Sequence, residues 1–394
     1  MTSKSPPASP LGLADAVNRA QASREGKLNI VAHNGSSVYG GAERALIRLL
    51  AGLQQRGHRV SLACNHDIVA DAAVRSLVPV LVQPLRGDLV LGDVLAFAKF
   101  LKREKPDALI IGTFKKIWLA GMAARRANVE RVVARVGLAS DTARRWKYRY
   151  ALNRWVDTVV LNADAMRATF EKSAPGFDPD NLVTIHTGVQ APRTKQGPAA
   201  FRRSVGIAPD ARVIGSVARL SKQKRLDRLL EAAAHLPGVH VVIAGEGTQR
   251  EALEALRDKL GVKDRVHLLG ERNDVGDVLA ALDVFVLTSD QEGMSNAMLE
   301  ALALGVPVVS TRVSGAEEAL APVDGDAPGV ITGYESAEIA NAVGALLRDP
   351  ERLDSARLAA LRVSGERFAF ERMLDEWELL LREGPAALQR SRGG

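Results

Sequence analysis

Short apolar runs alternate with segments of helical periodicity along most of the chain. The first run, residues 27–33, leads into a glycine-containing loop, and the next segment places Leu46, Leu49 and Leu53 on one helical stripe. A second apolar run at residues 59–64 completes a strand–loop–helix–strand unit. Such units build parallel sheets, so the pattern indicates an α/β protein.

The same rhythm continues to the C-terminus and predicts the remaining elements. Further strands are expected at residues 78–82, 108–113, 131–135, 158–161, 182–186, 213–217, 239–244, 266–269, 284–287, 308–309 and 329–332. Helices are expected at residues 90–105, 117–127, 141–155, 163–172, 201–205, 226–235, a segment ending at 260, 275–281, 297–304, 337–348, 350–368 and 370–382. We also expect a turn at Gly315 and a frayed end at residues 383–394.

Two successive halves of this kind are joined by a proline-containing linker at residues 187–197. They predict two facing, doubly wound Rossmann-like domains with a central cleft. At 394 residues the chain is also too long for one ordinary core. We expect a mobile tail at residues 1–26, a first domain at 27–190 and a second at 191–369.

Composition limits the class of protein. No run approaches the roughly 18–20 apolar residues of a membrane-spanning helix. Residues 1–10 are polar and rich in Pro and Ser, unlike a secretory signal, so a cytoplasmic protein is expected. The single cysteine, Cys64, excludes an internal disulfide and a cysteine-cluster metal site, and we expect it to be a small buried apolar residue.

The formal net charge of +7 is unevenly distributed. Residues 1–190 hold 27 Lys and Arg against 16 Asp and Glu, whereas residues 191–394 hold 26 against 30. A basic half favours an anionic partner such as a phospholipid surface, a nucleic acid or a phosphorylated acceptor, although a solvated basic face would show the same excess. The helix at 141–155 interleaves aromatic and basic residues. This suits an anionic membrane surface, or equally a helix that packs its rings inward.

The stretch at residues 289–309 combines a loop, a helix and a strand, with Glu292 in the loop and Glu300 on the helix. The turn into the helix, residues 293–296, offers unpaired N–H groups and a partial positive charge, which suit a phosphate. Two carboxylates would repel that phosphate, so they make better sense as ligands of neutral hydroxyls beside it. A sugar joined to a nucleotide diphosphate has this layout, while a surface helix with two solvated acids is the alternative.

The Gly40–Gly41 pair follows the first predicted strand, at the edge where open α/β sheets bind ligands. Without Cβ atoms, its backbone can approach a ligand closely, or simply form a turn with unusual dihedrals. The surrounding sequence matches neither G-x-G-x-x-G nor the phosphate-loop pattern, so an ordinary dinucleotide or ATP site is not supported.

A cationic loop at residues 218–225 supplies the complementary charge. Arg219 and Lys224 follow a strand of the second half, at the same sheet edge as residues 289–296. Arg offers a bidentate fork to phosphate oxygens and Lys a mobile point charge, so the two loops together would hold a diphosphate without a metal. No Asp-x-Asp metal pair occurs in a suitable loop.

With these motifs in place, the chain resembles the retaining nucleotide-sugar glycosyltransferases of the GT-B fold, specifically glycosyltransferase family 4. The resemblance covers nearly the whole chain and rests on four motifs. They are Gly-Gly-Ala-Glu at 40–43, Arg-Leu-x3-Lys at 219–224, Ala-Gly-Glu-Gly at 244–247, and Glu-Gly-Met-Ser-Asn-x3-Glu-Ala at 292–301 with Gly-Val-Pro-Val-Val at 305–309.

The resemblance implies a role for each motif residue. Arg219 and Lys224 would bind the donor diphosphate and stabilise it as it leaves. Glu292 would hold sugar hydroxyls, Glu300 the ribose hydroxyls, and Arg272 would lie near the base. The remaining donor contacts would come from the backbone of Gly40, Gly41, Gly293, Met294, Ser295 and Asn296. Gly41 would also face the acceptor, and the C-terminal segment 370–394 would cross back onto the first domain.

Two positions depart from the family pattern. The family often has a His near the end of the strand at 131–135, where this chain has Arg135-Val-Gly-Leu138, so Arg135 is the candidate on the acceptor side. The interdomain Asn-Gly-Val-Asp pattern appears as Thr187-Gly-Val-Gln190.

The expected activity is therefore retaining transfer of a hexosyl group from a nucleotide diphosphate sugar, with UDP favoured. The expected acceptor is a lipid-linked or envelope glycan. No metal, cofactor or nucleic acid is expected, and contact with the inner face of an anionic membrane would use the basic first half. The alternatives are a nucleotide-sugar epimerase or hydrolase of the same fold, and a non-catalytic protein that binds anionic membranes.

Overall fold

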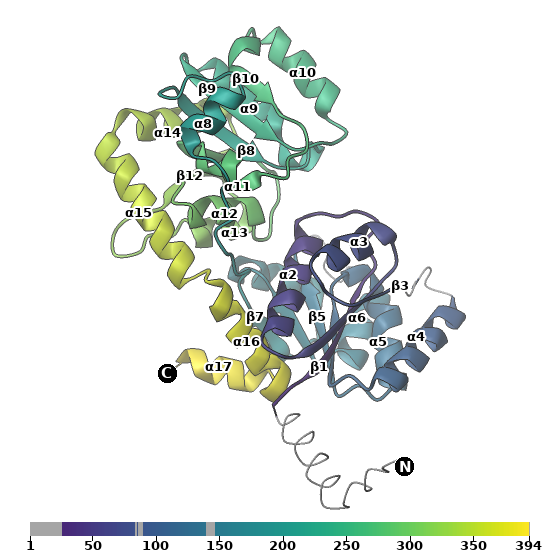
Figure 1. Cartoon of the computed structure of the whole chain (residues 1–394). Helices are drawn as coiled ribbons and strands as arrows, with labels where there is room; N and C mark the ends of the chain where they lie inside the picture. The colour runs from purple at the N-terminus through teal and green to yellow at the C-terminus, as the bar shows by residue number, and fades with distance from the viewer. Residues whose placement is uncertain (1–25, 83–84, 86–89, 139–145, 394) are drawn as a thin grey trace, which may run out of the picture.

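The computed structural model describes residues 26–82, 85, 90–138 and 146–393 of the chain. The expected tail, apart from residue 26, and the first residues of the basic helix at 141–145 lie outside the described residues. Within the described part, the strands form two parallel sheets, one of seven strands and one of six (Figure 1).

The first sheet has the order β3-β2-β1-β4-β5-β6-β7, and every pairing in it is parallel. Its strands are β1 (Asn29–Asn34), β2 (Arg59–Cys64), β3 (Val80–Val82), β4 (Ala108–Ile111), β5 (Arg131–Val136), β6 (Thr158–Leu161) and β7 (Leu182–Thr184). The helices between them are α2 (Gly41–Gln55), α3 (Asp67–Arg75), α4 (Leu91–Glu104), α5 (Ile117–Arg126), α6 (Trp146–Trp155) and α7 (Arg167–Ser173). We call this part the first domain.

The second sheet has the order β10-β9-β8-β11-β12-β13, again with parallel pairing throughout. Its strands are β8 (Arg212–Val217), β9 (Val239–Ala244), β10 (Val266–Leu268), β11 (Val284–Leu287), β12 (Val308–Thr311) and β13 (Gly329–Thr332). The helices around it are α8 (Pro198–Ser204), α9 (Leu226–Ala234), α10 (Arg250–Lys259), α11 (Val275–Ala280), α12 (Asn296–Ala303), α13 (Ser314–Ala319), α14 (Ser336–Arg348) and α15 (Pro350–Glu366). We call this part the second domain.

The cores explain why the strands are almost wholly apolar. Residues of α2, α3 and α16 cover one face of the first sheet, and residues of α4, α5 and α6 cover the other. Helices likewise cover both faces of the second sheet. A strand buried on both faces needs apolar side chains at successive positions, and this produces the short uninterrupted runs seen in the sequence. The predicted α/β fold of two Rossmann-like domains is confirmed.

The C-terminal segment returns to the first domain, as predicted. α15 extends along the second domain, and α16 (Phe370–Glu383) then lies beside α2 (Figure 1). Trp377 and Leu374 of α16 belong to the core of the first domain, and Arg56 at the end of α2 pairs with Glu371, Asp375 and Glu378 of α16. The second domain is therefore anchored to the first at both ends of its sequence.

Three local expectations are wrong. The predicted frayed end is a helix, α17 (Pro385–Gly393), because Leu388 is buried in the first domain and Gln389 donates to the Asp180 carbonyl at 3.0 Å. The turn expected at Gly315 is instead the first turn of α13. No element was expected between residues 64 and 78, where α3 lies with Val69 and Ala73 buried.

Among the helices of the described residues, none is long and apolar enough to cross a membrane.

Candidate functional site

Two loops meet at the carboxyl ends of β8 and β11, which are neighbours in the second sheet although β9 and β10 separate them in sequence. The chain order reverses between these strands, and ligands bind at such switch points in open α/β sheets. The backbone N–H of Asp290 donates to the Gln223 carbonyl at 3.0 Å, and the Gln223 side chain donates to the Gln291 carbonyl at 2.8 Å. The cationic loop and the Glu292 loop thus lie side by side, as the sequence predicted.

The glycine-containing turn after β9, residues 245–247, packs against the backbone of the cationic loop. Gly245 and Gly247 have φ values of +144° and +157°, and a Cβ atom on either would lie within 2.3 Å of a carbonyl oxygen of Ala218 or Leu220. The Leu220 N–H donates to the Glu246 carbonyl at 2.9 Å. Only glycine permits this close approach, so the Ala-Gly-Glu-Gly motif fixes the position of the backbone that carries Arg219.

Lys224 and Glu292 form an ion pair within this loop pair. Their side chains are only 20% and 10% exposed, and the Ser289 hydroxyl donates to the same Glu292 oxygen at 2.7 Å. Arg219, in contrast, is exposed, and within the described residues its guanidinium has no ion pair or hydrogen bond. Its charge is therefore available to an anionic ligand.

The turn after Glu292 leads into α12. Ser295 is the N-cap of this helix, and its hydroxyl accepts a hydrogen bond from the Met298 N–H at 3.4 Å. Gly293, before the cap, lies against the first domain, where its Cβ position would be 2.0 Å from the Gly137 carbonyl oxygen. The predicted phosphate-binding turn is therefore also an interdomain contact.

The start of α2, in the first domain, contacts the turn that leads into α12. The Asn296 side chain donates to the Gly41 carbonyl at 2.7 Å, which brings the two predicted backbone sites together. The Gly40 N–H donates to the Glu43 carboxylate at 3.0 Å. Arg135, at the end of β5, donates to the Ala42 carbonyl at 3.0 Å, so it also lies beside the start of α2.

The charge of Arg135 persists in this position. Burial lowers the pKa of its guanidinium to about 10, and the nearby Glu43 carboxylate acts in the opposite direction. A group with this pKa remains protonated at neutral pH, so Arg135 supplies a positive charge next to Gly41.

Arg48 lies in the site although the sequence alone does not identify it. It lies on α2, and its guanidinium pairs with the Glu300 carboxylate at 2.5 Å. Glu300 is 1% exposed, and no local pattern identifies a partner 252 residues away. The pairing removes the repulsion that two carboxylates would exert on a phosphate, because Lys224 neutralises Glu292 and Arg48 neutralises Glu300.

Arg272 lies in the loop after β10, and the structure does not join it to the other predicted residues. Its guanidinium pairs with Asp274 at 2.5 Å and lies 5.9 Å from the centre of the Phe201 ring. The side chain of Asp274 holds the pKa of Arg272 above its ordinary value.

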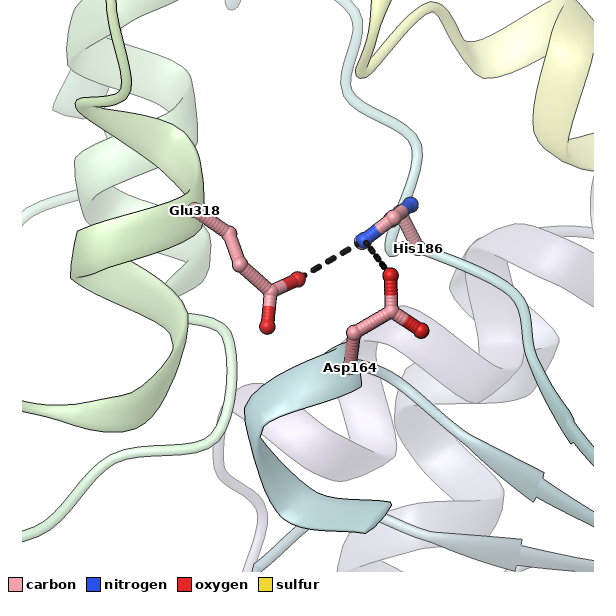
Figure 2. A group of neighbouring side chains, drawn as sticks. All are labelled: Asp164, His186 and Glu318. Carbon is pink, nitrogen blue, oxygen red and sulfur yellow. Dashed lines mark hydrogen bonds and ion pairs between the residues drawn. The ribbon is translucent and has the colours of Figure 1, made fainter.

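A second interdomain contact joins Asp164, His186 and Glu318 (Figure 2). Glu318, on α13, accepts a hydrogen bond from the Ala165 N–H at 2.6 Å, and its other oxygen lies 2.8 Å from His186 Nε2. Asp164 Oδ2 lies 3.8 Å from the same nitrogen. Burial alone would raise the pKa of Glu318, but the bonds from His186 and the backbone outweigh burial and hold this pKa below its ordinary value.

These three residues suit a hydrogen-bonded contact between the domains better than a metal site. The 2.8 Å between His186 and Glu318 is an ordinary hydrogen-bond length. His186 Nδ1 is buried and has no hydrogen-bond partner in the described structure, whereas a metal-binding imidazole usually donates its second N–H to a partner. We therefore call Asp164, His186 and Glu318 the interdomain triad.

Comparison with known proteins relates both domains to glycosyltransferases. The sequence model described as glycosyltransferase family 4 matches residues 39–193, and that of glycosyl transferases group 1 matches residues 199–361. The lipopolysaccharide core biosynthesis glycosyltransferase LpsE of Rhizobium meliloti is 31% identical over 288 residues, which are 70% of this chain and 77% of that protein. A D-inositol 3-phosphate glycosyltransferase of Mycobacterium bovis is 32% identical over 200 residues, 49% of this chain and 41% of that protein.

Solved structures agree on the fold. Anabaena Alr3699/HepE in complex with UDP and glucose superposes with a TM-score of 0.78 at 22% identity, over 90% of this chain and 100% of that one. WaaG, a glycosyltransferase involved in lipopolysaccharide biosynthesis, superposes with a TM-score of 0.65 at 17% identity, over 90% of this chain and 100% of that one.

Proposed function

The chain belongs to glycosyltransferase family 4, and from this premise we propose that it transfers a hexosyl group from a UDP-sugar with retention at the anomeric carbon. The observation that carries the proposal is the convergence of Arg219, Lys224 and Glu292 at the switch point of the second sheet. The UDP bound to Alr3699/HepE supports the choice of nucleotide.

Arg219 and Lys224 hold the donor diphosphate in this proposal. As the bond between the anomeric carbon and the diphosphate oxygen breaks, negative charge grows on the diphosphate and the two cations stabilise it. The acceptor oxygen bonds to the anomeric carbon from the same face, and the leaving diphosphate oxygen takes the acceptor proton. No protein nucleophile, metal or cofactor is assigned to this step.

The acids and the α12 N-terminus bind the rest of the donor. Glu292 accepts hydrogen bonds from sugar hydroxyls, and Glu300 accepts them from the ribose. The backbone that contacts the sugar and distal phosphate is that of Gly293, Met294, Ser295 and Asn296. Arg272 is the residue proposed to contact the base, and its pairing with Asp274 restricts its reach.

The first domain supplies the acceptor side. Gly40 and Gly41 border the phosphates, and Gly41 with Arg135 faces the acceptor. The contact between Asn296 and Gly41 supports this arrangement, because it joins the start of α2 to the turn that leads into α12.

A donor panel tests the proposal. We expect UDP-hexoses to raise the melting temperature of the full chain, because a ligand at 100 times its Kd adds about 2.7 kcal/mol to the free energy of unfolding. GDP- and ADP-hexoses serve as matched controls, and UDP release is then followed with and without a glycan acceptor. Stabilisation by none of the sugar nucleotides, or UDP release that no acceptor accelerates, would contradict transfer.

The acceptor is proposed to be a lipid-linked or envelope glycan at an anionic membrane. LpsE, which acts in lipopolysaccharide core biosynthesis, supports this acceptor class. The first domain also exposes apolar and aromatic side chains near its basic residues, with Trp146 69% exposed and Tyr150 51% exposed on α6. Trp118 and Trp155 pack behind them, so the rings form one cluster rather than isolated side chains.

Liposome sedimentation checks this membrane contact. We expect the chain to bind vesicles that contain anionic phospholipid, to leave neutral vesicles unbound, and to lose binding as salt rises. Trp146→Ala with Tyr150→Ala should weaken binding several-fold, because interfacial aromatic rings anchor a protein at the headgroup level. Equal binding to neutral and anionic vesicles would argue against the contact, and Tyr334→Ala, which alters an exposed ring of the second domain, is the matched control.

A further inference from the structure

The ion pair between Arg48 and Glu300 joins the two domains inside the proposed donor site. Arg48 belongs to α2 of the first domain, and its side chain is 36% exposed, whereas the side chain of Glu300 is 2% exposed. A carboxylate that has lost this much water needs a charged partner. Among the described residues, Arg48 is the only ion-pair partner of Glu300.

The pairing uses one oxygen of the carboxylate. Arg48 Nη2 donates to Glu300 Oε1 at 2.5 Å, and no hydrogen bond to Oε2 is found in the described structure. An ionised carboxylate accepts through both oxygens, so Oε2 retains its lone pairs for hydroxyl donors. The Arg48 contact therefore fixes the orientation of the group without using all of its capacity.

The same two helices touch a second time. Asn296 lies one turn before Glu300 on α12 and donates to the Gly41 carbonyl, two turns before Arg48 on α2. The two contacts fix the position of α2 against α12, and hence the direction from which Arg48 reaches Glu300.

We propose that Arg48 is a positioning residue for the donor: it holds the Glu300 carboxylate, through Oε1, in the orientation in which Oε2 accepts the ribose hydroxyls. This inference rests on the proposed function, in which Glu300 binds the ribose. It assigns a residue of the acceptor domain to nucleotide recognition, so the nucleotide site is complete only when α2 is docked on α12.

The test compares UDP with 2′-deoxy-UDP by calorimetry. Arg48→Gln should raise the Kd for UDP about tenfold, the size of one charge-assisted hydrogen bond, and should raise that for 2′-deoxy-UDP less. The preference for the ribonucleotide therefore falls. Arg48→Lys, which keeps the charge, should recover part of the preference. In turnover, the KM for the donor rises while kcat at saturating donor changes little.

A double-mutant cycle with Glu300→Gln shows whether Arg48 acts through Glu300. We expect Arg48→Gln to add little in the Glu300→Gln background, because coupled residues are not additive. Arg56→Gln is the matched control: it removes an arginine at the end of the same helix whose partners lie on α16. It should lower the melting temperature and leave the preference for UDP over 2′-deoxy-UDP unchanged.

The outcomes distinguish a failure of the Arg48 inference from a failure of the proposed function. Unchanged preference in Arg48→Gln, or tighter UDP binding because Arg48 occupies the ribose position, overturns the inference while wild-type binding of UDP upholds the proposed function. A wild-type protein that binds no nucleotide overturns both. If Arg48→Gln fails to fold, the Arg48→Lys variant and the Glu300→Gln cycle with it still decide the matter.

Discussion

Replacing Arg219 by alanine is expected to lower kcat by about 10²-fold or more, the typical effect of removing one preorganised donor from a site of developing charge. The residue is exposed at the carboxyl end of β8, and its guanidinium has no ion-pair partner among the described residues. Lys224 already shares its charge with Glu292, whereas Arg219 supplies a positive charge that no carboxylate of the described residues neutralises.

The measurement is steady-state UDP release with saturating donor and acceptor. Arg219→Lys should retain part of the activity, because it keeps the charge but loses the bidentate fork. Arg212→Ala is the matched control, since Arg212 begins the same strand at its opposite end and is also exposed. Near-wild-type turnover of Arg219→Ala would remove Arg219 from the catalytic step.

The elements that converge at this site could be predicted because parallel strands all end at one edge of a sheet. Residues 218–225 and 289–296 each follow a buried strand, so their location at one edge of the sheet follows from the alternation of strands and helices without knowledge of the strand order. The order itself could not be predicted, and it is what makes β8 and β11 neighbours.

The interdomain contacts could not be predicted, because they depend on how two finished domains dock. Arg48 has the local pattern of a solvent-facing helix residue, and Glu300 that of a surface acid, yet they pair across 252 positions. The interdomain triad could not be predicted either, since Asp164, His186 and Glu318 come from three separate segments. Short helices such as α13 were missed for a related reason: six residues show little periodicity, and tertiary contacts decide their conformation.

Gly293 illustrates how such a contact constrains a motif residue. The family resemblance implies that the backbone of Gly293 contacts the donor, and the structure shows that Gly293 also packs against the first domain. A Cβ atom at Gly293 would lie 2.0 Å from the Gly137 carbonyl oxygen and 2.8 Å from the Asn162 side chain, both in the first domain. On the other side, a Cβ atom at Gly315 would lie 2.0 Å from the Gly293 carbonyl oxygen, so the turn has no room to retreat.

Gly293→Ala is therefore expected to keep the domains from docking at this point and to lower kcat/KM by about 10²-fold, the effect of a 1 Å misplacement of reacting groups. The helices that cover both faces of each sheet are unchanged, so the melting temperature should change little, while small-angle scattering should show a larger radius of gyration. Gly365→Ala is the matched control, because no atom lies within 4 Å of its Cβ position on α15. A Gly293→Ala enzyme with wild-type kcat/KM would show that catalysis does not require the contact between Gly293 and Gly137, and that the donor turn works without the first domain behind it.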